Sequence, residues 1–207
     1  IDMHIQPNKK FFIMLQLLRL QDVQDEVIEK LINGLPKNLY FHNVERVKEL
    51  FNLVDLYSRA EEMSDEDKLV VKTAALLADV GYIQSYDEHE EYSIEFAKDF
   101  LPRFKYNQEQ IEKICALIDI TKQNRKPQNK LEEILLDAEM NYLSRADFVS
   151  LNEQLFKEQL EHGKIESKED WVKMQVVLLS NHKYYTQVAN VLRDVNPDSQ
   201  IENLLQN

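Results

Sequence analysis

Apolar residues recur at intervals of three or four along nearly the whole chain, and this spacing predicts one helix after another. Residues that interrupt helices are scarce, since the 207 residues include only three glycines and five prolines. We therefore predict an all-α fold, a single-domain helical bundle of about nine or ten helices with no sheet over residues 1–207. No repeat or linker divides the chain.

Glycine, proline and capping residues set the expected helix boundaries. Gly34 ends the first helix, Ser64 and Asn107 cap later ones, and Pro102 closes another. The expected helices are 9–33, one from about 38 that includes 44–57, 64–80, 89–101, 107–120, 131–143, 146–161, 168–180 and 184–192. The stretch 70–80 is apolar almost all round and is expected at the centre of the core. Beyond Pro197 we expect only a short, loosely attached helix.

Charge narrows the classes of partner. Acidic residues outnumber basic ones by 37 to 25, so the formal net charge is −12, which disfavours binding to nucleic acid or to an anionic membrane. The apolar stretch 11–18 is too short to span a bilayer, and no signal-peptide cleavage site follows it. We expect a cytoplasmic protein whose partner is a small anionic metabolite or another protein; a homodimer is also possible.

Two kinds of site are excluded by composition. The single cysteine, Cys115, rules out an intramolecular disulfide and a cysteine-cluster metal site, and its apolar helix predicts an inert core residue. Three glycines cannot build a Gly-rich phosphate loop. In the second half of the chain we expect Trp171 to anchor the closing helices, and we assign no chemistry there.

Two aspartates lie inside apolar helical runs. Asp79 follows 74–78 and Asp137 follows 135–136. Carboxylates are rarely buried unless they are paired, hydrogen-bonded or bound to a metal. The two therefore predict a shared polar site; the alternative is that each caps a helix or meets a surface lysine.

Four segments that carry these residues resemble motifs of a known family. In chain order they are Phe41-His42-Asn43-Val44-Glu45-Arg46, Ala75-Leu76-Leu77-Ala78-Asp79-Val80-Gly81-Tyr82, His89-Glu90-Glu91-Tyr92-Ser93 and Leu135-Leu136-Asp137-Ala138-Glu139-Met140-Asn141-Tyr142-Leu143-Ser144-Arg145. Their order resembles the HD superfamily of metal-dependent phosphohydrolases, in a bacterial branch that reads Tyr-His-Asn-x-x-His, Ala-x-x-His-Asp-x-Gly-Tyr, His-Glu-x-x-Ser and Leu-x-Asp-Ala-Asp-x-x-Tyr-Leu-Gly-Arg. The resemblance covers about 38–182. It implies an HD-like motif-bearing core at about 38–145, on which helices of 146–207 pack.

The resemblance also implies a metal site that this chain has partly lost. The family's ligand positions correspond here to Arg46, Ala78, Asp79 and Asp137, so two histidines are missing. Ala78 has no donor atom, and the guanidinium of Arg46 cannot shed its charge to bind a metal. We expect no cofactor; a divalent metal on Asp79 and Asp137 would be held weakly.

The remaining family positions give the other candidate site residues. The resemblance implies catalytic roles for His42, as general acid, and Asp79, and it places His89 at the same pocket. Glu90 and Lys122 are further candidates for ligand binding, together with Arg46. Lys122 belongs to a basic stretch, 122–130, in which Arg125 and Lys126 could also receive a phosphate; the alternative is a solvated loop. His4, His162 and His182 have no supporting context, and Asn43 and Tyr82 are expected as helix-start and packing residues.

Arg46 suggests how the site changed. Two buried carboxylates repel each other, and one guanidinium can neutralise both. We predict that Arg46 pairs with Asp79, and in a second contact with Asp137, so that an internal cation replaces the metal. The alternative is that Arg46 faces solvent and pairs with Glu45 or Glu49.

Three functions follow from these patterns. The favoured one is a catalytically impaired, metal-free HD-like domain that binds a small anionic, phosphorylated ligand or a protein partner, because the loss of two ligands removes the Lewis acid. The second is an active phosphohydrolase with a shifted ligand set of His42, Asp79, His89 and Asp137. The third is a structural helical protein with a vestigial pocket.

Overall fold

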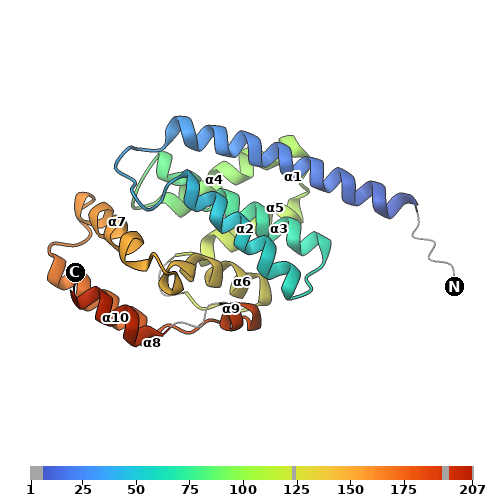
Figure 1. Ribbon diagram of the computed structural model, residues 1–207. Coiled ribbons are helices and arrows are strands. Elements are labelled where there is room, and N and C mark those ends of the chain that lie inside the picture. Colours follow the sequence, from blue (N-terminus) through green and yellow to red (C-terminus); the bar gives the residue numbers. More distant parts are fainter. Residues whose placement is uncertain (1–6, 123–124, 193–195, 207) are drawn as a thin grey trace.

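The computed structural model describes residues 7–122, 125–192 and 196–206, and within these ranges the chain forms helices and no strand (Figure 1). The all-α prediction is thereby confirmed. The α-helices are α1 (Pro7–Gly34), α2 (Val44–Ala60), α3 (Asp65–Leu77), α4 (His89–Phe100), α5 (Gln108–Ile120), α6 (Lys130–Glu139), α7 (Phe148–Glu161), α8 (Lys168–Asn181), α9 (Gln187–Leu192) and α10 (Pro197–Gln206). Three 3₁₀ turns separate some of them: η1 (Val80–Ile83), η2 (Leu101–Phe104) and η3 (Met140–Ser144).

Side-chain caps set the starts of most of the central helices. Ser64 accepts a hydrogen bond from the backbone N–H of Asp67 at the start of α3, and Asn107 forms a full capping box with Gln110 at the start of α5. Both caps confirm the sequence-based prediction. Asn129 caps α6, because its side chain accepts hydrogen bonds from the backbone N–H groups of Leu131 and Glu132. This cap lies within the basic stretch 122–130, which was expected to be a loop.

Several boundaries differ from the prediction. The second helix begins at Val44 rather than near 38, because Asn43 caps it and the preceding segment lies in turns. The third ends at Leu77, and a 3₁₀ turn carries the chain through Gly81, where an added Cβ would lie 1.8 Å from the carbonyl oxygen of His89. The helix expected over 131–143 divides into α6 and the tighter turn η3.

The main hydrophobic cluster is built from α1 to α6 together with Ala189 of α9, and α3 lies at its centre. Every residue of 69–77 in α3 is buried, including Thr73, whose hydroxyl bonds the carbonyl of Leu69 and the phenol of Tyr106. The expectation of a central, nearly all-apolar helix is thus confirmed. Cys115 lies at the edge of this cluster, half-buried, and burial raises the pKa of its thiol.

The helices α7, α8 and α10 surround a second, smaller cluster. Trp171 is 2% exposed within it and packs near Phe156, which confirms its expected anchoring role. The last helix begins at Pro197. It is attached more firmly than expected, because it buries Leu204 against α7 and α8. Phe41, which precedes α2, and Tyr142 of η3 also belong to this second cluster. No helix of the described ranges is long and apolar enough to cross a membrane.

Candidate functional site

The centre of the candidate site is an ion-paired arginine. Arg46, in the first turn of α2, forms an ion pair with Glu139 of α6, and its Nε lies 3.8 Å from Oδ2 of Asp79. Its guanidinium also lies 4.6 Å from the centre of the Phe41 ring, a cation–π contact. The predicted pair with Asp79 is confirmed, and Arg46 does not adopt the solvent-facing alternative, since its side chain is 16% exposed.

Arg46, Asp79 and Glu139 form a buried triad, in which the charge of each member shifts the pKa of another. Burial alone lowers the pKa of Arg46, but the charges of Glu139 and Asp79 hold it above its ordinary value. Burial raises the pKa of Glu139, and Arg46 works against this shift. The Nε of Arg46 and Oδ2 of Asp79 are buried and have no hydrogen-bond partner among the described residues. The cation is therefore fixed by two carboxylates, one of which it reaches without a direct hydrogen bond.

Ser93 holds Asp79 in position. Its hydroxyl donates to the carbonyl of Ala78 at 2.7 Å and accepts from the N–H of Gly81 at 2.8 Å. Both bonds are buried, and they fasten η1 to α4. The same packing brings His89, the first residue of α4, beside the turn that follows Asp79.

Two histidines of the quoted motifs, His42 and His89, flank a tyrosine. The Tyr82 ring stacks on His89 with 3.8 Å between ring centres, and His42 lies 4.7 Å away on a tilted ring plane. His89 Nδ1 lies 3.3 Å from Glu90 and from the carbonyl oxygen of Tyr86. Burial lowers the pKa of His89, which favours its neutral form. His42, His89 and Glu90 thus lie together as predicted, and Tyr82 has the packing role expected of it.

A buried glutamate from the C-terminal part of the chain completes the site. Glu158 of α7 is fully buried; it accepts hydrogen bonds from the backbone N–H groups of Phe41 and His42, at 2.9 and 3.1 Å, and pairs with Nδ1 of the His42 ring. The hydroxyl of Tyr86 donates to it as well, at 3.2 Å. These bonds hold the pKa of Glu158 below its usual range although burial acts in the opposite direction.

Asp137 lies elsewhere. Its carboxylate accepts hydrogen bonds from the backbone N–H groups of Tyr185 and Thr186 and from the hydroxyl of Thr186, at 2.7 to 3.2 Å. It thereby fastens the segment before α9 to α6. The expected contact between Arg46 and Asp137 is wrong: the second carboxylate is Glu139, because residues two apart on a helix point in different directions.

The basic stretch is also engaged elsewhere. Lys122 pairs with Glu91 at 2.8 Å and with Asp119 at 2.9 Å, and Arg125 pairs with Asp119 at 2.6 Å. Lys126 is exposed. The predicted ligand-binding role of Lys122 therefore finds no contact with Arg46 or its partners in the described residues. Positions 123 and 124 of this stretch lie outside them, as does His4.

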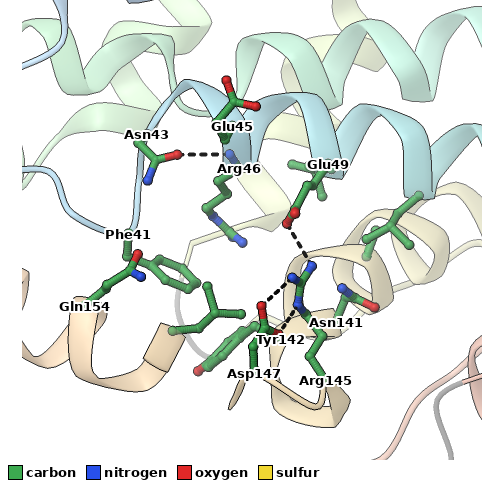
Figure 2. Close-up of a pocket in the computed structure, with 14 residues that line it drawn as sticks. Phe41, Asn43, Glu45, Arg46, Glu49, Asn141, Tyr142, Arg145, Asp147 and Gln154 are labelled. Atoms are coloured by element: carbon green, nitrogen blue, oxygen red, sulfur yellow. Dashed lines mark hydrogen bonds and ion pairs between the residues drawn. The ribbon is translucent and has the colours of Figure 1, made fainter. Parts of the chain in front are cut away.

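A pocket of about 210 Å³ opens beside the ion-paired arginine, between the start of α2, η3 and α7 (Figure 2). Arg46, Arg145, Asn43 and Asn141 contribute to its lining. Oδ1 of Asn141 is buried and lacks a hydrogen-bond partner among the described residues. Arg145 is held in Figure 2 by Glu49 and Asp147. Figure 2 also shows the N–H of Arg46 bonded to the capping side chain of Asn43.

The side chains present do not fit a divalent metal at the ligand positions that the HD resemblance implies. Ala78 offers no donor, Arg46 is a paired cation, and the Asp137 oxygens are committed to the segment before α9. The shifted set needs His42 and Asp137 around the same ion, yet His42 Nδ1 is paired with Glu158. Across the described ranges, no group of three or more His, Cys, Asp or Glu side chains is arranged to hold a metal ion.

Sequence reasoning missed Glu139 and Glu158. Glu139 stands in the quoted motif two residues after Asp137, so either acid could have been chosen. Glu158 lies in a highly charged helix, but it shares the face of Phe148, Asn152 and Leu155, which was the available signal.

Comparisons with protein-family models, with curated proteins and with solved structures gave no match. The likeness to the HD superfamily therefore rests on the four motifs and their order, and it stays a prediction.

Proposed function

We propose that this chain is a metal-free module of the HD type that binds a small anionic ligand and does not hydrolyse phosphate esters. The observation that carries the proposal is the guanidinium of Arg46 between Asp79 and Glu139. A permanent cation at a metal-ligand position neutralises the carboxylates that a metal would need, and it supplies no activated water.

The pocket beside Arg46 supports a binding role. Nη2 of Arg46 is used by Glu139 and Nε faces Asp79, whereas Nη1 makes no hydrogen bond within the described residues. The pocket is also lined by Asn141, whose side-chain Oδ1 has no hydrogen-bond partner among the described residues, so a ligand that carries both an acceptor group and a donor is favoured. A pocket of about 210 Å³ limits that ligand to a small metabolite.

The charge of the lining limits an anionic ligand to a single anionic group. Two arginines, Arg46 and Arg145, face three acids, Glu45, Glu49 and Asp147. The acids lie toward the rim, where their side chains are 50% to 77% exposed and their charge is screened by water. A polyphosphate would nevertheless be repelled, so a carboxylate or a phosphate monoester fits better.

Thermal shift and calorimetric titration test the proposal with acetate, inorganic phosphate and a nucleoside monophosphate as probes. We expect at least one probe to raise the Tm and Arg145→Gln to weaken its binding about tenfold. Arg103→Gln is the matched control, because Arg103 pairs with Glu26 outside the pocket. If no probe raises the Tm, the binding function is wrong and the third alternative, a structural helical protein with a vestigial pocket, replaces it.

Hydrolysis assays with manganese, magnesium, iron or zinc address the enzymatic alternative. The proposal predicts no turnover of phosphate esters with any of these ions. Turnover that is abolished by Asp79→Asn would show that the module is an active phosphohydrolase.

A further inference from the structure

The first half of α1 carries an apolar surface that nothing in the described chain covers. Large apolar side chains at the surface are scattered elsewhere, but here they follow one another along one helix, each 46% to 57% exposed. Four of them, Phe11, Met14, Leu15 and Leu18, share one side of the helix and are called the outer stripe, whereas Leu17 lies outside it. Figure 1 shows this half of α1 extending past the other helices. A contiguous apolar patch of this kind marks an interaction site.

The outer stripe points away from the bundle. Leu20, Val23, Val27 and Leu31 bury the opposite side of α1 in the main cluster. Each residue of an α-helix turns the chain by about 100°, which places the stripe on the far side from these residues. The stripe therefore contributes nothing to the core of its own chain.

We propose that the outer stripe joins two copies of this chain, with their α1 helices antiparallel. The positions of the stripe residues are symmetric about the midpoint between Met14 and Leu15. A two-fold axis at this midpoint sets Phe11 of each copy opposite Leu18 of the other. Self-complementarity of this kind is what a two-fold interface requires. This surface is separate from the proposed ligand pocket and does not depend on it.

Charge favours the antiparallel arrangement over the parallel one. The second half of α1 exposes Asp22, Asp25, Glu26 and Glu29, whereas its start at Pro7 carries the positive end of the helix dipole. The two-fold axis between Met14 and Leu15 places Pro7 of one copy level with Asp22 of the other, so the positive end of each helix dipole lies beside the acidic half of its partner. Parallel helices would place like charges together.

A hollow beside the stripe offers room for the opposing side chain. It measures about 620 Å³, and Leu15, Leu18 and Phe104 form its apolar wall. Phe11 of a second copy lies at the level of Leu18 in the antiparallel arrangement, next to this wall. An aromatic side chain seated in an apolar hollow is a frequent energetic anchor of an interface.

Sedimentation equilibrium of the whole chain at 0.15 M salt tests the dimer, because the repulsion between two chains of −12 is then screened within about 8 Å. We expect twice the chain mass of 24.6 kDa and, for Leu18→Asp, a dissociation constant raised about a hundredfold or more. Val177→Asp is the matched control, an exposed apolar residue on α8, and should leave the mass unchanged. A monomer at every concentration, or a dimer unaffected by Leu18→Asp, overturns the proposal. It is also overturned if the stripe binds neutral phosphatidylcholine vesicles and the chain does not dimerise.

Disulfide trapping in a Cys115→Ser background tests the orientation. The double variant Phe11→Cys/Leu18→Cys should cross-link on oxidation. Either single variant should not, because equivalent residues then lie about 10 Å apart along the axis, beyond the roughly 7 Å that a disulfide spans between Cα atoms. Cross-linking of the single variants would show parallel helices and overturn the antiparallel arrangement.

Discussion

At the scale of single residues, the candidate site depends on which of two neighbouring acids faces Arg46. Asp137 and Glu139 are two residues apart on α6, so their side chains leave the helix on different sides. Glu139 reaches the arginine and Asp137 binds the segment before α9. The sequence predicted a cation between buried carboxylates, and it named one of them, Asp79, correctly. It could not select the second, because both acids stand in the same motif and only the phase of α6 decides between them.

Removal of the cation should cost more than the loss of an ordinary ion pair. Arg46→Met leaves Asp79 and Glu139 buried without a countercharge, and we expect the free energy of unfolding at pH 7 to fall by about 3–5 kcal/mol. Arg103→Met removes the exposed pair with Glu26 and should cost less than about 1 kcal/mol. Urea unfolding of both variants measures the difference, and equal losses would contradict a buried triad.

The pH dependence of Arg46→Met has a defined sign. Burial already raises the pKa of Glu139 in the wild type, and the pKa rises further when the cation is removed. A carboxyl with a raised folded pKa favours the folded state below its unfolded pKa, and this advantage is lost as the pH rises through the folded pKa. The deficit of Arg46→Met should therefore shrink as the pH is lowered from 7 toward 5, which urea midpoints at both values will show.

Glu158 should behave in the opposite way. Its pKa is lowered in the fold, so its contribution to stability is complete above the unfolded value and is lost as the pH falls through the folded pKa. Glu158→Ala leaves the N–H groups of Phe41 and His42 without their acceptor and should cost about 2–4 kcal/mol at pH 7. Glu158→Gln keeps an acceptor oxygen and should cost less. Equal stability of the wild type and Glu158→Ala across pH 7 to 4 would show that ionised Glu158 does not stabilise the fold.

At the scale of elements, the sequence predicted helices better than it predicted their ends. Caps with a local side-chain signature, such as Ser64 and Asn107, were identified because their partners lie three residues away. The end of α3 and the division between α6 and η3 were missed, because tertiary packing decides them. In η1, the backbone tightens where Gly81 meets α4, which is a contact between distant parts of the sequence.

Gly81 should be the least replaceable glycine. A Cβ there would overlap the carbonyl oxygen of His89, a backbone atom, so Gly81→Ala must move α4 away from η1 and should cost more than about 2 kcal/mol. Gly163→Ala is the matched control: its φ of +67° imposes strain of only about 1 kcal/mol, and no atom lies within 4 Å of the added Cβ. Thermal unfolding compares the two, and a smaller loss for Gly81→Ala would contradict the close packing of η1 on α4.

At the scale of the whole molecule, the candidate site lies where the two hydrophobic clusters meet. Phe41 and Tyr142 belong to the smaller cluster, while the neighbouring stretch 44–54 of α2 packs in the larger one. Glu158 ties α7 to the loop before α2 across this junction. The C-terminal helices, to which the sequence assigned no chemistry, therefore help to position His42.

The metal content of the purified protein tests the central claim most directly. Elemental analysis after incubation with manganese, magnesium, iron or zinc should find far less than one ion per chain in the wild type. In contrast, Arg46→His/Ala78→His, which places two imidazoles beside Asp79, should retain a metal. Stoichiometric metal in the wild type that is lost on Asp79→Ala would contradict the claim that Arg46 has taken the place of the metal.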